Sequence, residues 1–159
     1  MDVSKFTRAL IASVTIGVVA TSFGQVDART AIQGNYDKVS RLSMKKDITR
    51  LEKTIRRNAA SNFHTIDSMQ NTLDLGATVR QNTDQLSKVA KFNSNTNKIV
   101  GMKPKGRDLV CTVETNFDLI MSDKKKTRVT GNVVSEDTWI KTVKGWKIKQ
   151  SKVVKESSL

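Results

Sequence analysis

The pattern of hydrophobic positions is clearest in residues 109–121, where apolar side chains recur at nearly every second position. A period of two over that length predicts a long β-strand with one buried face. That face would include Cys111, the one cysteine of the chain, and we therefore expect a buried, unreactive thiol there. The residues predicted to point inward are Leu109, Cys111, Val113, Thr115, Phe117, Leu119 and Met121.

Two more strands are predicted after this one. Residues 128–142 alternate in the same way, but their pattern does not decide which face is buried. Gly131 in this segment predicts a bulge or a bend. Residues 122–127 would form the preceding turn, residues 146–154 the last strand, and residues 156–159 a tail.

The last two strands are joined by a predicted hairpin. Segments rich in β-branched and aromatic residues flank Thr142-Val-Lys-Gly145, and Gly145 can adopt the positive φ of a tight turn. Both tryptophans, Trp139 and Trp146, lie on this hairpin. Packing in the core and stacking on a ligand are the two roles open to them.

Helical spacing of apolar residues characterises the chain before the long strands. Positions three and four apart predict a helix over residues 30–46 and a second helix over residues 48–59. Asp47 lies between them and has the chemistry of an N-cap for the second helix. A weaker pattern predicts a third helix over residues 76–91. Helices followed by a run of strands indicate an α+β fold.

Short segments connect these elements. Residues 62–67 are a candidate for a short strand, and residues 68–71 for a loop. Residues 93–97 are polar, and we expect a turn there, with the sheet beginning at residues 98–102.

The first residues have the features of a secretory signal peptide. A basic start precedes an uncharged, mostly apolar run over residues 9–20, and small residues follow. The run is shorter than the about 20 apolar residues of a membrane span, and an uncleaved anchor is the second interpretation. Cleavage after Ala20, Gly24 or Ala28 would place the protein in the periplasm or the medium. The predicted organisation is a signal peptide over residues 1–28, one domain over 29–156 and a tail over 157–159.

Composition and charge exclude several classes of site. The chain has 159 residues, with 28 Lys and Arg against 15 Asp and Glu, and a net charge of +13. A hydrophobic content of 37% is that of a globular domain. One cysteine excludes an internal disulfide, and one histidine excludes the usual ligand set of structural zinc. No Gly-rich phosphate loop is present, which argues against nucleotide chemistry. We therefore expect neither a metal nor a cofactor.

Positive charge gathers in two clusters, within residues 103–107 and 124–128, and neither contains an aromatic residue. Such clusters are typical of solvated loops, and the alternative is a loose attraction to an anionic polymer or membrane surface. No motif for specific recognition of nucleic acid is present.

The order of elements is two helices, a short strand, a third helix, and long strands ending in an Asp-x-Trp…Gly-Trp hairpin. It resembles the nuclear transport factor 2-like superfamily, within it the SnoaL-like and DUF4440-type groups, and more distantly the ketosteroid isomerases. The resemblance implies a cystatin-like cone, in which a curved antiparallel sheet wraps around the N-terminal helices and opens onto an apolar pocket. It also implies homodimers formed through the sheet face. The segments that carry it are Lys46-Asp47, Phe63-His-Thr-Ile-Asp67, Asp137-Thr-Trp139 and Gly145-Trp146-Lys-Ile148.

The resemblance to isomerases implies two acidic residues in the site. Asp67 matches the position of a carboxylate base, and Asp137 that of a protonated acid that donates to an oxyanion. The tyrosine of that site has no match, since Tyr36 lies about one turn before the expected position near Val39.

Both acidic residues also have a structural interpretation. Asp67 would then be a turn carboxylate that accepts hydrogen bonds from Asn71 or nearby amides. Asp137 would be a cross-strand partner of Lys147 or Lys149.

The pocket implied by the resemblance would be lined by Tyr36, Phe63, His64, Phe117 and Trp139. A hydrogen-bonded or exposed His64 is the alternative to a catalytic base. The function that follows is binding of a small apolar ligand, or of a protein partner, by an exported domain. The alternative is a SnoaL-like or isomerase-like enzyme, with Asp67 as base and Asp137 as oxyanion donor.

Overall fold

Three helices and six strands make up residues 23–158, the part of the chain that this computed structural model describes. Most of the predicted signal peptide lies outside these residues, whereas two of its cleavage points, after Gly24 and Ala28, fall in the first turns of α2. No helix among the described residues is both long and apolar enough to cross a membrane. The elements are α2 (Phe23–Met44), α3 (Ile48–Asn58), β1 (Ala59–Ile66), β2 (Thr72–Asp74), α4 (Leu75–Ser87), β3 (Val89–Lys105), β4 (Asp108–Met121), β5 (Arg128–Thr142) and β6 (Gly145–Ser158).

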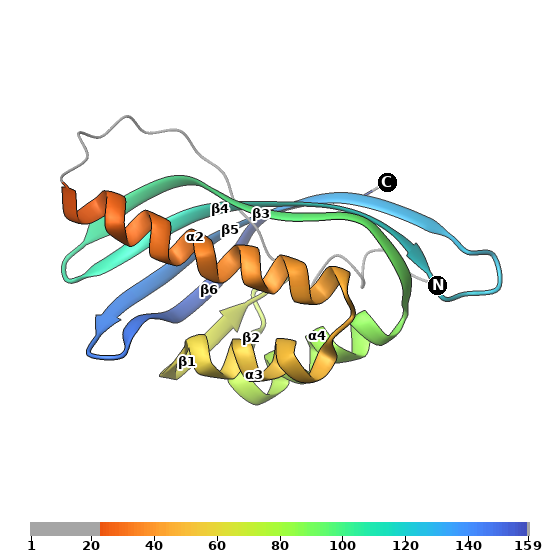
Figure 1. Cartoon of the computed structure of the whole chain (residues 1–159), viewed down its shortest axis with the longest axis horizontal. Coiled ribbons are helices and arrows are strands. Elements are labelled where there is room, and N and C mark those ends of the chain that lie inside the picture. Colours follow the sequence, from red (N-terminus) through yellow and green to blue (C-terminus); the bar gives the residue numbers. More distant parts are fainter. Residues whose placement is uncertain (1–22, 159) are drawn as a thin grey trace.

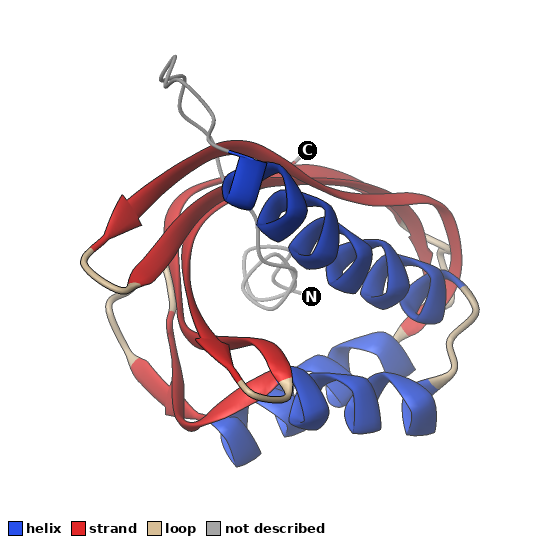
Figure 2. Cartoon of the chain, turned by 60° about the vertical axis from the view of Figure 1, so that its left-hand side comes forward, coloured by secondary structure: helices blue, strands red, loops and turns tan. Residues whose placement is uncertain are grey.

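The strands form one curved sheet in the order β2-β1-β6-β5-β4-β3. Neighbouring strands are antiparallel except β1 and β6, which are parallel, so the sheet is mixed rather than purely antiparallel. Helix α2 crosses the concave side of the long strands, and α3 and α4 lie together near β1 and β2 (Figure 1). Figure 2 shows how far the long strands bend around α2. The α+β class and the cone-like wrapping of the sheet are confirmed.

The junction between α2 and α3 forms as its residues predict. Lys46 adopts a left-handed φ of 52°, and the amide of Asp47 donates to the carbonyl of Leu42 at 3.0 Å, which closes the end of α2. The carboxylate of Asp47 then accepts from the amide of Arg50 at 3.1 Å, and this N-cap starts α3. The sharp turn lets α3 pack beside α2 on the core.

Strand β4 confirms the predicted alternation, because all seven residues expected to point inward are buried. Cys111 is among them and has no exposed surface. The sequence pattern did not decide which face of β5 is buried. In the structure Val133, Asp137 and Trp139 point inward. The predicted hairpin also forms, with Thr142 paired to Gly145 and a φ of 98° at Gly145.

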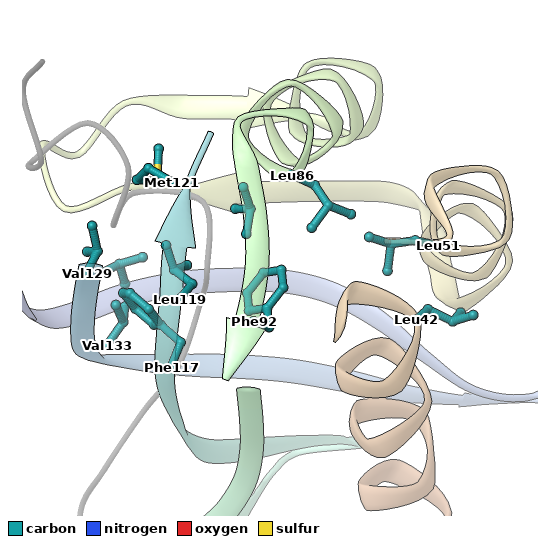
Figure 3. Close-up of a cluster of buried hydrophobic side chains, with 11 residues drawn as sticks. Leu42, Leu51, Leu86, Phe92, Phe117, Leu119, Met121, Val129 and Val133 are labelled. Atoms are coloured by element: carbon teal, nitrogen blue, oxygen red, sulfur yellow. The ribbon is translucent and has the colours of Figure 1, made fainter. Parts of the chain in front are cut away.

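Side chains from both layers make the core. One cluster joins the C-terminal end of α2 and helices α3 and α4 to the inner face of β3, β4 and β5, and Figure 3 shows Leu42, Leu51, Leu86 and Phe92 facing one another across it. A second cluster joins the start of α2 to the other end of the same strands, around Trp139. Polar side chains, among them Ser40 of α2 and Asn97 of β3, also lie between the helix and the sheet.

Two predicted loop segments are strand instead. Residues 93–97, expected to form a turn, lie within β3 and pair with β4, because backbone hydrogen bonds to a neighbouring strand do not depend on side-chain polarity. Residues 156–158, expected in the tail, extend β6 and pair with β5.

Gly131 does not mark a bulge, since the register between β4 and β5 is continuous through it. A Cβ at this position would lie 2.4 Å from Cζ of Phe117. The glycine therefore makes room for the ring of Phe117 on the neighbouring strand.

Candidate functional site

A cavity of about 140 Å³ lies between the helices and the inner face of the sheet. Residues of α2, α3, α4, β1, β3, β5 and β6 line it. Its volume is close to that of cavities that bind a single benzene-sized molecule. Its apolar lining consists of Val39, Leu51, Ile55, Phe63, Trp139 and Ile148, and its amide lining of Asn35, Asn58, Asn82, Asn95 and Asn97.

Gln33 is one of the side chains that bind helix α2 to β3, together with Arg29 and Ser40. The side chain of Gln33 donates to the carbonyl of Asn97 at 2.7 Å and accepts from the amide of Ile99 at 2.9 Å. These two bonds hold the Gln33 face of the helix against β3. Tyr36 and Ser40 follow Gln33 by three and seven residues in the sequence, and so share its face of the helix. This arrangement points the Tyr36 phenol at the sheet.

The polar end of the cavity is built around Asp137. Its Oδ1 accepts from Ser135 at 2.7 Å and from Ser151, its partner on β6, at 2.6 Å. Its Oδ2 accepts a hydrogen bond from the phenol of Tyr36. The Tyr36 oxygen in turn accepts from Nε1 of Trp139 at 3.1 Å, and the two rings meet edge to face, 5.6 Å between centroids.

Burial governs the protonation of this cluster. It raises the pKa of the Asp137 carboxyl above its ordinary value, and the hydrogen bonds from Ser151, Tyr36 and Ser135 oppose that rise. Burial, followed by the charge of Asp137, raises the pKa of the Tyr36 phenol well above its ordinary value. Burial thus favours the neutral forms of Asp137 and Tyr36 more than water does.

The cavity carries little charge. Among the described residues, those that line it include no Lys, Arg, His or Glu, and its two titratable side chains, Tyr36 and Asp137, are bonded to each other. A neutral occupant is therefore favoured over an ion, because a charged ligand would find no counter-ion there.

The structure places Asp67 outside this lining, in the turn between β1 and β2. Its Oδ1 accepts from the amides of Met69 and Asn71, both at 2.8 Å, and its Oδ2 accepts from the Asn71 side chain at 2.9 Å. This is the turn carboxylate that the sequence allowed as an alternative. Asp67 and Asp137 do not share the cavity, and the pairing of the two as base and donor has no geometric basis.

The other expected site residues divide between the cavity and the outside. Tyr36, Phe63 and Trp139 line the cavity, whereas His64 and Phe117 do not. Strand alternation turns His64 away from the side of Phe63, and its ring lies 3.3 Å from the carbonyl of Asn62. Phe117 is on the inner face but packs within the core cluster, against Gly131.

The expected lysine partner of Asp137 is also absent. Asp137 faces Ser151 across β5 and β6, and Lys149 instead pairs with Asp108 at 3.0 Å. Ser151 and the amide residues of β3 were missed by sequence reasoning. In the sequence they are only polar residues within strand-like segments. The same pattern is typical of a solvent-exposed strand, so it does not predict a cavity lining.

No group of three or more His, Cys, Asp or Glu side chains within residues 23–158 has the arrangement of a metal site. The polar groups of the cavity are hydroxyls, carboxamides and one carboxyl. Such a set recognises a ligand by hydrogen bonds rather than by coordination.

The comparisons with known proteins give the fold. No family model and no curated protein matches the sequence. Among solved structures, a scytalone dehydratase candidate from Novosphingobium aromaticivorans superposes with a TM-score of 0.70 at 9% identity, over 85% of this chain and 88% of that one. A nuclear transport factor 2-like superfamily protein from Salmonella enterica gives 0.62 at 14% identity, over 81% and 91%. A hexachlorocyclohexane dehydrochlorinase (LinA) type 2 gives 0.63 at 10% identity, over 87% and 93%. The chain has the nuclear transport factor 2-like fold.

Proposed function

We propose that this chain, on its nuclear transport factor 2-like fold, binds a small, neutral, mostly apolar molecule in the cavity between α2 and the sheet. The proposal rests on one observation. The cavity has an apolar lining, a volume that fits one benzene ring, and one buried polar cluster, Tyr36 and Asp137, at its wall. Pockets of this composition use apolar contact for affinity and a few placed polar groups for orientation.

The cavity between α2 and the sheet is preferred over wider hollows on the outside. A depression of about 630 Å³ runs along the end of β6, but polar side chains such as Lys152 and Glu156 line much of it. Such a surface offers little apolar area to a ligand. The smaller cavity offers six large apolar side chains from five different helices and strands of the fold.

The experiment that tests this function uses benzene as the probe and one substitution at two places. Benzene is titrated into isotope-labelled protein, and saturable NMR shifts are followed at residues of the cavity. Val39→Phe fills part of the lining, whereas Val143→Phe adds the same ring at the fully exposed hairpin turn. We expect the wild type and Val143→Phe to bind, and Val39→Phe to lose binding at least tenfold. Absence of saturable binding to the wild type contradicts the proposal.

A second candidate function is an elimination reaction, because a carboxyl with a raised pKa is a stronger base once it ionises. Two of the similar structures carry the names of eliminating enzymes, a dehydratase and a dehydrochlorinase. In such a step Asp137 would take a proton next to a carbonyl and return it to the β-hydroxyl, which leaves as water as the C=C bond forms, and the Tyr36 phenol would hold the carboxylate in between.

The two functions separate by a rate measurement. A β-hydroxy ketone is incubated with the protein, and the enone product is followed by its ultraviolet absorbance. Dehydration that disappears in Asp137→Asn and persists in Asp67→Asn, a carboxylate outside the cavity, supports the enzyme. Binding without any dehydration supports the binding protein.

A further inference from the structure

Among the described residues that line the cavity, Asn95 is the one whose side-chain nitrogen and oxygen are both fully buried and without a hydrogen-bond partner. The residue is 3% exposed and lies on β3, in the lining of the cavity. Buried carboxamides are normally bonded, because removing them from water without replacement destabilises the folded state. Asn95 is therefore an unpaired donor and acceptor that the fold itself does not use.

Asn97 lies two residues further along β3, and its carboxamide is hydrogen-bonded through both its nitrogen and its oxygen. It lines the same cavity, but its Nδ2 donates to Ser40 on α2 at 2.7 Å, and its Oδ1 accepts from Thr115 on β4. Asn97 thus joins the helix to the sheet. The structure gives Asn95 no comparable role, although the two side chains point to the same side of β3.

Asn95 is also separate from the Asp137 cluster. Through Phe117 of β4 it aligns with Gly131 of β5, which precedes Asp137 by six residues. The unpaired carboxamide and the carboxyl therefore lie at different places along the cavity wall. A ligand that satisfies Asn95 need not compete for the hydrogen bonds of Tyr36.

The chemistry of a carboxamide restricts what can satisfy it. It presents an N–H donor beside a carbonyl acceptor, and a single partner satisfies both only if it carries an acceptor beside a donor. A neutral cis-amide edge, as in a lactam or a primary amide, does so with two parallel hydrogen bonds. The cavity of about 140 Å³ has room for one ring behind that edge.

Resting on the proposed ligand-binding function, we propose that Asn95 is the specificity-determining residue of the cavity, and that it pairs through both ends of its carboxamide with a neutral ligand that carries a cis-amide edge on a single small ring. Apolar contacts hold the ring, and Asn95 selects the edge. A site built to hydrogen-bond a ligand rejects an analogue that lacks the matching groups, because its own polar atoms then stay buried and unpaired.

The binding test uses three probes of one ring: 2-pyridone with the N–H and C=O edge, N-methyl-2-pyridone without the donor, and benzene without either. Each is titrated into the wild type and into Asn95→Leu, which has a similar size and no polar atom. We expect the wild type to bind 2-pyridone at least tenfold more tightly than the N-methyl compound. Asn95→Leu should lose that preference and keep its affinity for benzene.

The outcomes separate this inference from the proposed function. If the wild type binds benzene but does not prefer 2-pyridone, or if Asn95→Leu keeps the preference, the role of Asn95 is overturned and the ligand-binding function stands. If the wild type binds none of the three probes, both proposals fall.

A stability measurement tests the unpaired state directly. Because Asn95→Leu removes two unpaired polar atoms, we expect its Tm without ligand to rise by about 3 °C. Asn97→Leu is the matched control and should lower Tm, since it leaves Ser40 and Thr115 without the bonds that Asn97 makes to them. A lower Tm for Asn95→Leu would show that its carboxamide is already satisfied in the empty protein, and would overturn the inference.

Discussion

The phenol of Tyr36 on α2 donates a hydrogen bond to the carboxyl of Asp137 on β5, although 101 residues separate them in the sequence. The bond joins α2 to the β5–β6 hairpin across the wall of the cavity. It also couples the protonation of the one carboxyl in the lining to the position of α2.

Asp137→Asn should remove a pH dependence of stability. Because the pKa of Asp137 is raised in the folded state, the folded protein keeps a proton that the unfolded chain releases above about pH 4. Wild-type stability from this group is therefore full at low pH and is lost as the pH rises toward the folded pKa, by at most about 1.4 kcal/mol per pH unit. Urea unfolding of both proteins between pH 3.5 and about pH 8 measures the difference. A difference that stays constant with pH would contradict it.

Tyr36→Phe should destabilise the fold by about 1–3 kcal/mol. It leaves Nε1 of Trp139 and Oδ2 of Asp137 without the bonds that the phenol makes to them. Urea unfolding, followed by tryptophan fluorescence, measures the loss. The same change in an Asp137→Asn background should cost less, because the two residues act on each other. Equal losses in both backgrounds would show that the bond contributes nothing to stability.

Gly131→Ala should destabilise the protein by about 1–3 kcal/mol, because the added Cβ would overlap the ring of Phe117 at 2.4 Å. Phe117→Leu in the same chain should recover part of the loss by withdrawing the overlapping atoms. Gly34→Ala is the matched control: this exposed position in α2 has nothing within 4 Å of a new Cβ, and alanine should stabilise it by about 0.5–1 kcal/mol. The three variants are compared by thermal unfolding. A stable Gly131→Ala would argue against the close approach of Phe117.

Cys111 should be unreactive in the folded protein. Burial, followed by the charge of Asp137, raises the pKa of its thiol to about 12, so at pH 8 only about one molecule in 10,000 carries a thiolate. A chromogenic disulfide reagent should label it within minutes in urea and only over hours in buffer. Labelling in buffer at the rate seen in urea would mean that this part of β4 opens readily.

Local patterns were enough to predict several elements of this fold. The alternation over β4, the Asp47 cap and the Gly145 turn all depend on residues close in sequence, and each has the predicted conformation. Polar side chains led to a wrong prediction at residues 93–97, where the side chains are typical of a turn but the backbone pairs as a strand. Asn95 and Asn97 are polar because of the cavity they face, yet their backbone completes β3.

The residues of the candidate site were also predictable only in part. Phe63 and Trp139 could be proposed for a pocket from their place in the order of elements, but the same reasoning also chose His64 and Phe117. One residue of register decides between the two faces of β1, and packing along the sheet decides whether an inward ring borders the cavity or the core. Neither the register of β1 nor the packing along the sheet can be predicted from the residue pattern of a single strand.

The sequence by itself determined the class of fold, the order of its longer elements and the inward face of β4, since periodicity and caps are local properties of the chain. Only the tertiary structure decided the site. It brought Tyr36 and Ser151 to Asp137, fixed Asp67 in a turn, and left Asn95 buried without a partner. These relations depend on how a curved sheet and a helix meet in space, and contacts between residues so distant in the chain have no local pattern to predict them.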